Sequence, residues 1–212
     1  QGAYAAGFVA YEAAAAFGLP CGSRAGDLPL VSFGIFEPSH VDSLTRLPRG
    51  GPMRLGRWRP SVDRAAYLEA IRAIKARIEA GDTYQINFTF RLAADFEGDP
   101  RTLMRELHAA QAGEWNAYLH TRDYTICSAS PELFFALDGR DIRCRPMKGT
   151  APRGFWPAQD LLRAEELRMS DKNRAENVMI VDMVRNDIGR IARVGSVRAA
   201  PMFEVERYPL QW

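Results

Sequence analysis

Glu132 is the first of three side chains, far apart in the chain, whose surroundings suit catalytic chemistry. It follows Ser130-Pro131 and precedes the apolar run 133–135. Proline restricts its predecessor to extended geometry and cannot join a central ladder, so we expect Glu132 just after a break in the chain. Apolar surroundings would favour the protonated carboxyl group, as a general acid requires. The alternative is a surface glutamate at a strand end, and this segment alone favours it.

Lys148 is the second such side chain, in the segment Pro-Met-Lys-Gly-Thr at 146–150. A lysine at the end of a hairpin strand, before a glycine-containing turn, can project into a cleft. Gly149 allows the backbone to approach a ligand closely, and neighbouring N–H groups can receive an anion. A partly desolvated lysine becomes a nucleophile or a base. The alternative is a solvated loop lysine. If Glu132 and Lys148 lie on the two arms of one hairpin, they can face one cavity.

Glu176 is the third, within an apolar helical segment at 173–187. It shares one helix face with Asp187, with apolar residues between them. An acid on a mostly apolar face is costly unless it is paired or bound to a metal. A hard oxygen ligand of this kind suits Mg²⁺, which usually takes one or two protein carboxylates plus substrate oxygens. An ion pair with Arg174 or Arg185 is the alternative, and the segment leaves both open.

The elements that position these residues follow from hydrophobic periodicity. Apolar residues at helical spacing predict a helix that Ser61 or Asp63 caps and Gly81 closes. Alternation with period two predicts a strand with one buried face at 84–92. Further helices are expected at 100–111, 159–169 and 171–186, the last capped by Ser170 or Asp171. Further strands are expected at 117–120, 124–128, 133–137 and 142–145.

The order of these elements predicts the fold class. Asp138-Gly139 between two strand-like runs indicates a hairpin. Antiparallel hairpins with segregated helices favour an α+β fold over a parallel α/β sheet. The segment 47–60, rich in Gly, Pro and Arg, marks a loop or a junction between subdomains.

Composition excludes several classes of protein. The chain has 212 residues, 47% of them apolar and 25% charged, which is typical of a globular protein rather than a disordered one. Its 28 basic and 26 acidic residues are interspersed, so nucleic-acid binding is not indicated. Three cysteines without a C-x-x-C pair argue against disulfides and structural zinc and favour the cytoplasm. No apolar stretch approaches the roughly 18 residues that span a membrane.

Four segments together resemble the chorismate-binding enzyme family: 81–87, 128–134, 146–150 and 174–189. They occur in family order with family-like spacing, and the resemblance covers about residues 60 to 212. It implies antiparallel sheets packed in layers with outer helices, as in anthranilate synthase component I. It also implies an N-terminal variable region at 1–58 and, at 59–212, the first part of the chorismate-binding domain, C-terminally truncated.

Two positions distinguish activities within the family. Lys148 precedes Gly-Thr, where aminodeoxychorismate synthases typically carry lysine and anthranilate and isochorismate synthases usually carry alanine. Asn177 stands where anthranilate synthases tend to have histidine. The resemblance thus implies Mg²⁺-dependent conversion of chorismate and ammonia to 4-amino-4-deoxychorismate, for 4-aminobenzoate and folate. Anthranilate synthase component I, isochorismate synthase and a non-catalytic binding module that keeps the fold are the alternatives.

The resemblance also implies a role for each motif residue. Lys148 would attack C2 of chorismate and displace the C4 hydroxyl, which Glu132 would protonate, and ammonia would then add at C4 and expel the lysine. Glu176 would hold Mg²⁺ on the ring carboxylate, while Gly149 and Thr150 would line the substrate site. Ammonia would come from a glutamine amidotransferase subunit or domain. Neither nucleic acid nor a membrane is an expected partner.

Overall fold

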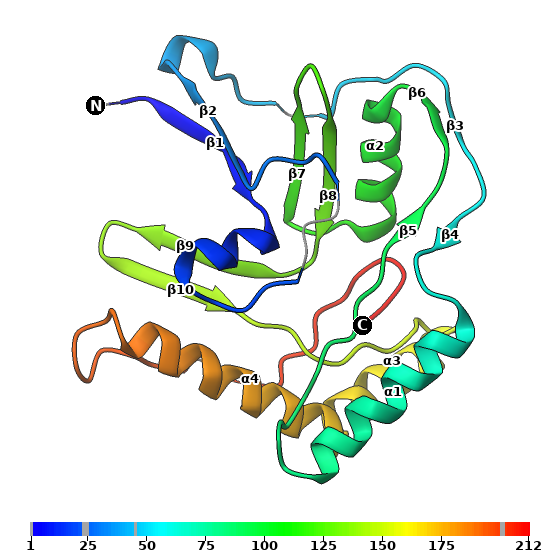
Figure 1. The fold of residues 1–212 in the computed structure, drawn as a ribbon, viewed down its shortest axis with the longest axis vertical. Helices are drawn as coiled ribbons and strands as arrows, with labels where there is room; N and C mark the ends of the chain where they lie inside the picture. The colour runs from blue at the N-terminus through cyan, green and yellow to red at the C-terminus, as the bar shows by residue number, and fades with distance from the viewer. Residues whose placement is uncertain (1, 23–25, 45, 200–201) are drawn as a thin grey trace. The chain divides into compact units, whose positions relative to one another are not determined.

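The computed structural model describes residues 2–22, 26–44, 46–199 and 202–212 (Figure 1). The chain divides into two compact units. The larger unit comprises residues 1–49 and 103–212, and the smaller one comprises 50–102. Both units combine helical segments with antiparallel strand pairs. The expected division into an N-terminal variable region at 1–58 and the first part of a chorismate-binding domain at 59–212 stays a prediction.

The smaller unit is built around the helix α1, Arg64–Glu79. Asp63 caps it, because its carboxylate accepts the Ala66 N–H at 2.8 Å, as predicted. Gly81 lies just beyond the helix end with a positive φ of 78°, a backbone conformation that glycine adopts without steric cost. The strands of this unit form two short antiparallel pairs: β3 (Met53–Leu55) with β6 (Phe96–Gly98), and β4 (Arg59–Pro60) with β5 (Leu92–Ala93).

The strand predicted at 84–92 is wrong for all but its last residue. Only Leu92 belongs to a strand, and Tyr84 is 88% exposed. A strand requires a hydrogen-bonded neighbour, and residues 84–91 have no ladder partner within the described part of the chain. The alternating pattern instead places aromatic rings against the helix. Tyr67 of α1 contacts the rings of Phe88 and Phe90, with centroids 5.8 and 6.0 Å apart.

Within its described residues, the larger unit contains three antiparallel pairs: β1 (Tyr4–Val9) with β2 (Val31–Phe36), β7 (Trp115–His120) with β8 (Thr125–Ser130), and β9 (Leu133–Asp138) with β10 (Asp141–Arg145). Its helices are α3 (Pro157–Met169) and α4 (Asp171–Gly189), with two short 3₁₀ helices at Tyr11–Phe17 and Pro38–His40. The helix α2 (Pro100–Gln111) begins in the smaller unit and continues into the larger one. Strand pairs and helices predicted for 100–186 are confirmed within a few residues.

The β9–β10 hairpin brings the segment before residue 133 next to the segment after residue 145. Its turn follows Asp138, and Gly139 has a positive φ of 58°. Register is regular to Arg143, which pairs with Ala136, and then shifts so that Arg145 pairs with Leu133. Two residues of β9 therefore oppose one residue of β10, which is a β-bulge. Glu132 and the 146–150 segment emerge from the same end of this hairpin.

Ser170 forms the corner between α3 and α4. Its hydroxyl accepts the Asn173 N–H at 3.4 Å, and its carbonyl accepts the Arg174 N–H at 2.9 Å. The predicted cap of the second helix is confirmed. The first turn of α4, which carries Asn173 and Arg174, is thereby fixed relative to the end of α3.

Apolar burial is concentrated at a few positions. The buried apolar side chains among the described residues are Ala13, Met104, Leu133 and Tyr208. Leu133 begins β9, and the Tyr208 hydroxyl lies 3.3 Å from the carbonyl oxygen of Pro131. The segment 202–212 thus packs at the base of the hairpin. None of the helices in the described ranges has the length and apolarity to cross a membrane.

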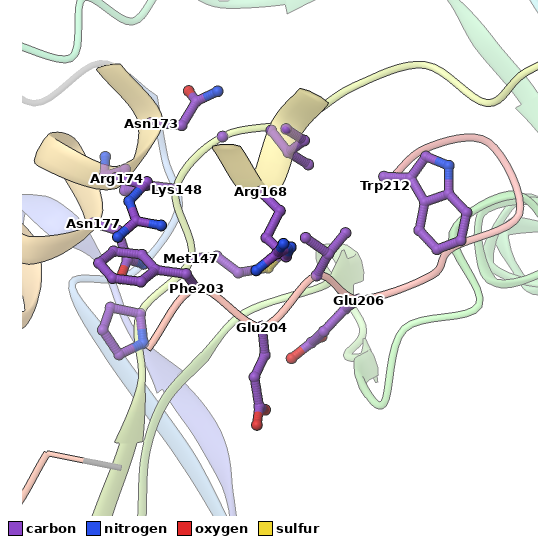
Figure 2. A pocket seen from close by; sticks show the side chains of 14 residues that line it. Met147, Lys148, Arg168, Asn173, Arg174, Asn177, Phe203, Glu204, Glu206 and Trp212 are labelled. Atoms are coloured by element: carbon purple, nitrogen blue, oxygen red, sulfur yellow. The ribbon is translucent and has the colours of Figure 1, made fainter. Parts of the chain in front are cut away.

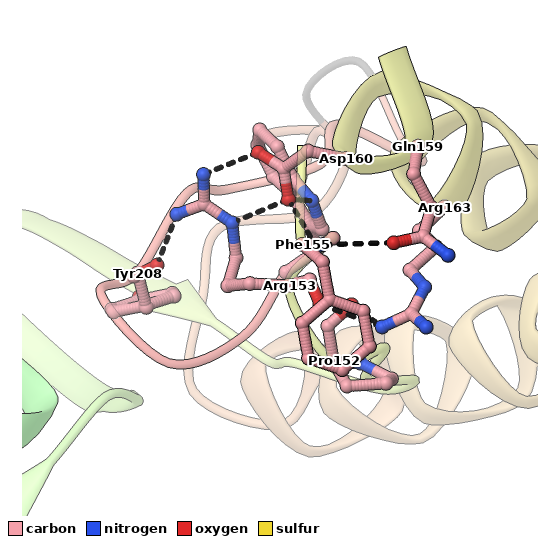
Figure 3. A network of polar contacts seen from close by, with 9 residues as sticks. Pro152, Arg153, Phe155, Gln159, Asp160, Arg163 and Tyr208 are labelled. Atoms are coloured by element: carbon pink, nitrogen blue, oxygen red, sulfur yellow. Dashed lines mark hydrogen bonds and ion pairs between the residues drawn. The ribbon is translucent and has the colours of Figure 1, made fainter. Parts of the chain in front are cut away.

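A polar network fastens the segment 202–212 to the start of α3 (Figure 3). Arg153 donates two hydrogen bonds to the Asp160 carboxylate, one of them at 2.8 Å, and one to the Tyr208 carbonyl at 2.7 Å. Asp160 also accepts the Trp212 indole N–H at 2.9 Å. Trp212 and Ala151 exchange backbone hydrogen bonds of 2.8 and 3.1 Å. Charge-assisted, two-pronged pairing of this kind holds both groups in one geometry.

This network predicts how stability depends on pH. Hydrogen bonds from Arg153 hold the pKa of Asp160 well below its usual value of about 4. The carboxylate therefore stabilises the fold above that usual value, and the contribution is lost as pH falls through the depressed one. We expect Asp160→Asn to lower the urea midpoint clearly at pH 7, and the gap from wild type to narrow below about pH 4.

The matched control is Asp182→Asn. Asp182 bonds Arg185 at 2.8 Å, and its side chain is 64% exposed. Exposed pairs of this kind contribute little to stability. Equal urea midpoints for the Asp160 and Asp182 variants at pH 7 would contradict a structural role for the network.

Candidate active site

A cavity of about 100 Å³ lies in the larger unit beside the segment 146–149 (Figure 2). Its walls come from that segment, from the end of α3, from the first two turns of α4 and from the segment 203–206. The lining side chains of the helices are Leu167, Arg168, Asn173, Arg174 and Asn177. The volume is below the roughly 300–1,000 Å³ typical of complete small-molecule sites.

Lys148 lines this cavity and is half-buried. It follows β10 closely, so the hairpin carries it to the cavity wall. Its amine has no ion pair or hydrogen bond to any other described residue. An amine without an anionic partner remains available for a ligand or for bond formation.

Glu132 lies next to the lysine segment but is not part of the cavity wall. One of its carboxylate oxygens accepts the Met147 N–H at 3.1 Å, so the hairpin does bring the acid beside Lys148. The expected apolar enclosure is not present, because Glu132 is exposed and Phe134 is 84% exposed. Neighbouring Phe134 and Phe135 pack on each other rather than over the carboxyl group, with ring centroids 5.3 Å apart.

Glu176 projects from α4 beside the cavity rather than into it. Its neighbour Asn177 lines the cavity, and successive helix residues differ by about 100° in direction. The side chain is 28% exposed, and its nearest cation is Lys172, with nitrogen and oxygen 3.9 Å apart. The ion pair expected as the alternative to metal binding is therefore present only as a long contact. Its cation is Lys172 rather than Arg174 or Arg185.

The described residues contain no cluster of three or more His, Cys, Asp or Glu side chains that could hold a metal ion. Mg²⁺ does not need such a cluster, because it commonly binds one or two carboxylates and takes its other ligands from substrate and water. Glu176 therefore fits Mg²⁺ only as a single protein carboxylate, with the other ligands supplied by substrate and water.

Gly149 is constrained by its backbone and by its neighbour. Its φ is +83°, and an added Cβ would lie 3.0–3.1 Å from three side-chain atoms of Asn173. The lysine-bearing segment therefore rests directly on the first turn of α4. Thr150, the other residue predicted to bind substrate, is exposed and lies outside the lining.

Several lining residues escaped the sequence analysis. The segment 203–206 has no periodicity that would predict its place beside α4. Within it, Glu206 bonds Arg145 and accepts the Tyr208 hydroxyl at 2.7 Å. Burial, together with the bond to Glu206, raises the pKa of Tyr208 to about 12. The phenol therefore stays a hydrogen-bond donor at neutral pH.

Arg174 was considered only as a partner for Glu176, but it lines the cavity. Its guanidinium lies 4.3 Å from the centroid of the Phe203 ring. Figure 2 shows this stack with Lys148 and Asn177 beside it. With two cationic groups and two amide side chains at one end of the cavity, the arrangement suits an anionic ligand better than a neutral one.

The fold agrees with a solved structure of anthranilate synthase component I from Streptococcus pneumoniae TIGR4. The TM-score is 0.76 at 21% identity, over 99% of this chain and 55% of that one. This similarity shows that the chain has the α+β fold of anthranilate synthase component I, as predicted. Residues 1–210 match the family described as chorismate binding enzyme, and the chain belongs to that family.

The curated relatives include both aminodeoxychorismate synthases and anthranilate synthases. Aminodeoxychorismate synthase component 1 of Klebsiella aerogenes is 43% identical over 152 residues, which are 72% of this chain and 34% of the relative. Anthranilate synthase component 1 of Thermus thermophilus is 40% identical over 152 residues, which are 72% of this chain and 33% of the relative. The matches thus span about a third of the length of these relatives.

The contact between Gly149 and Asn173 yields a test of the site's packing. We expect Gly149→Ala to destabilise the protein by about 1–2 kcal/mol from its left-handed backbone, with a further loss from the contact with Asn173. Asn173→Ala removes two of the three contacting atoms, Cγ and Oδ1, and leaves Cβ, so the double variant should lose less stability than the sum of the single variants. Urea unfolding of the four proteins measures this coupling.

Gly139→Ala is the matched control, because Gly139 also has a positive φ but has nothing within 4 Å of an added Cβ. It should show the backbone cost alone. Strict additivity of Gly149→Ala and Asn173→Ala would show that the two residues do not press on each other.

Proposed function

We propose that this protein converts chorismate and ammonia to 4-amino-4-deoxychorismate with Mg²⁺, for the synthesis of 4-aminobenzoate and folate. The observation that carries the proposal is the placement of Lys148. Its amine lines the cavity without a partner among the described residues, and Glu132 is bonded to the adjacent Met147 N–H. The 43% identity to a relative named aminodeoxychorismate synthase component 1 supports the same reaction.

In the proposed reaction the lysine amine attacks C2 of chorismate. The ring double bonds shift, and the C4 hydroxyl leaves as water when Glu132 gives it a proton. Ammonia then attacks C4, the double bonds shift back, and the C2–nitrogen bond breaks to release the lysine. Hydroxide is a poor leaving group, so the step needs an acid close to the nucleophile. The hairpin supports this role for Glu132, since the acid and the segment of Lys148 leave it at the same end and the Glu132 carboxylate accepts the Met147 N–H.

Glu176 is the residue that we propose as the magnesium ligand. It is a partly buried acid whose long contact with Lys172 leaves its charge only weakly compensated. The metal, when bound, would supply positive charge to a substrate carboxylate. Gly149 and Thr150 complete the proposed substrate-binding residues, the first through its position on the cavity wall.

We further propose that ammonia comes from a glutamine amidotransferase subunit or domain. The name component 1, which several similar proteins carry, supports a multi-component enzyme. Cys21, Cys127 and Cys144 form no disulfide among the described residues, which supports a reducing compartment such as the cytoplasm.

Anthranilate synthase is the second candidate function. The 40% identity to the Thermus thermophilus protein of that name favours it. Forming anthranilate from chorismate requires loss of the enolpyruvyl side chain, and that elimination needs a base. Asn177 lines the cavity, and a neutral amide cannot accept a proton at neutral pH. Its presence supports a product that retains the side chain.

The product distinguishes the two candidates. We expect the protein, supplied with chorismate, Mg²⁺ and ammonium, to form 4-amino-4-deoxychorismate, measured by liquid chromatography with mass detection. Fluorescent anthranilate as the main product would reject the proposal in favour of the second candidate. Binding of chorismate with no product at all would instead identify a non-catalytic binding protein.

Lys148→Ala tests the proposed nucleophile. We expect its turnover with ammonia to fall by about 10²–10⁴-fold or more, since positioned acid, base or nucleophilic groups contribute this much. Lys172→Ala is a suitable control, because Lys172 is 81% exposed and meets Glu176 only at 3.9 Å. Wild-type turnover in Lys148→Ala would remove the lysine from the mechanism.

A further inference from the structure

Arg174 differs from Arg145, Arg153 and Arg168 in its pairing. Arg168 forms a two-pronged pair with Glu165 at 2.7 and 2.8 Å. Arg145 bonds Glu206, and Arg153 bonds Asp160. No acidic side chain among the described residues pairs with Arg174. The cavity wall thus includes a guanidinium group with uncompensated charge.

Phe203 holds that guanidinium by one face. A stacked guanidinium keeps the N–H donors of its edge free, and these match a carboxylate in two-pronged geometry. The ring itself sits on a strained residue, because Phe203 has a φ of +67°, which side-chain-bearing residues rarely adopt. Strained residues persist where the surroundings hold them, and they gather at ligand sites.

The groups around Arg174 favour an anion in the space before it. Lys148 is a second cation without a partner among the described residues, and Asn177 offers amide hydrogens. The acids of the wall do not cancel this charge. Glu206 is already bonded to Arg145 and Tyr208, and Glu204 is exposed and turns away from Arg174 in Figure 2.

We infer that Arg174 is a substrate-binding residue that holds one of the two carboxylates of chorismate in a two-pronged contact. This inference rests on the proposed function and adds to it a recognition residue outside the predicted set. The carboxylate would lie against the first turn of α4, where the helix dipole also favours negative charge. Lys148, which lies beside Arg174 in the cavity wall, would then face the ring of the same molecule.

The test compares chorismate binding in four variants by isothermal titration calorimetry, with ammonia absent. Arg174→Ala should weaken chorismate binding by about 10- to 100-fold, because hydrogen bonds to a charged group typically contribute this much to affinity. Arg174→Lys should recover part of this loss, because it restores the charge but not the planar fork. Arg168→Ala should weaken binding by about threefold at most, because Glu165 already neutralises that arginine. Lys148→Ala should lower turnover far more than binding.

Each outcome has one reading. Suppose that the wild type binds and aminates chorismate and that Arg174→Ala binds it with the same affinity. This result overturns the inference about Arg174 and leaves the proposed function standing. Absence of chorismate binding in the wild type overturns both. An equal loss in Arg168→Ala and Arg174→Ala would show a general charge effect and reject a specific contact. Thermal unfolding checks each fold, and Arg174→Gln, which keeps most of the stem, replaces any variant that unfolds.

Discussion

The site depends on one contact, the seating of the 146–150 segment on the first turn of α4. Gly149 meets Asn173 so closely that an added methyl group would lie 3.0–3.1 Å from the Asn173 side chain and would force that side chain to shift. On the other side, the Glu132 carboxylate accepts the Met147 N–H. The lysine is thereby held between a hairpin and a helix, and each support comes from a different part of the chain. Its position is decided by backbone geometry and short-range packing rather than by a deep apolar core.

Local patterns predicted most of the framework and part of the site. The Asp63 and Ser170 caps and the hairpin turn after Asp138 were predictable because each is determined by residues within a few positions in the chain. The strand at 84–92 failed because periodicity describes which side chains share a face, whereas a strand also requires a partner. Lys148 was found for the same local reason, since glycine and proline mark its turn.

The rest of the site arises from long-range contacts that leave no local pattern. Arg174 and Phe203 meet across an aperiodic segment, and Trp212 reaches Asp160 from the far end of the chain. Apolar enclosure of Glu132 was expected from the three residues that follow it, but only Leu133 is buried, while Phe134 and Phe135 lie at the bulge and pack on each other. Composition near a residue in sequence is therefore a poor guide to its solvent exposure at the end of a strand.

The bulge in the hairpin has a consequence for how this region can change in length. Because strand side chains alternate between two faces, the extra residue in β9 decides on which face Glu132 emerges relative to β10. Loss of a single residue between Glu132 and Asp138 would restore regular pairing and turn the carboxylate to the opposite face. Loss of one residue from each strand beside the turn would keep the bulge and leave the Glu132 carboxylate on its present face. Length variation in this hairpin is therefore compatible with the site only in matched pairs.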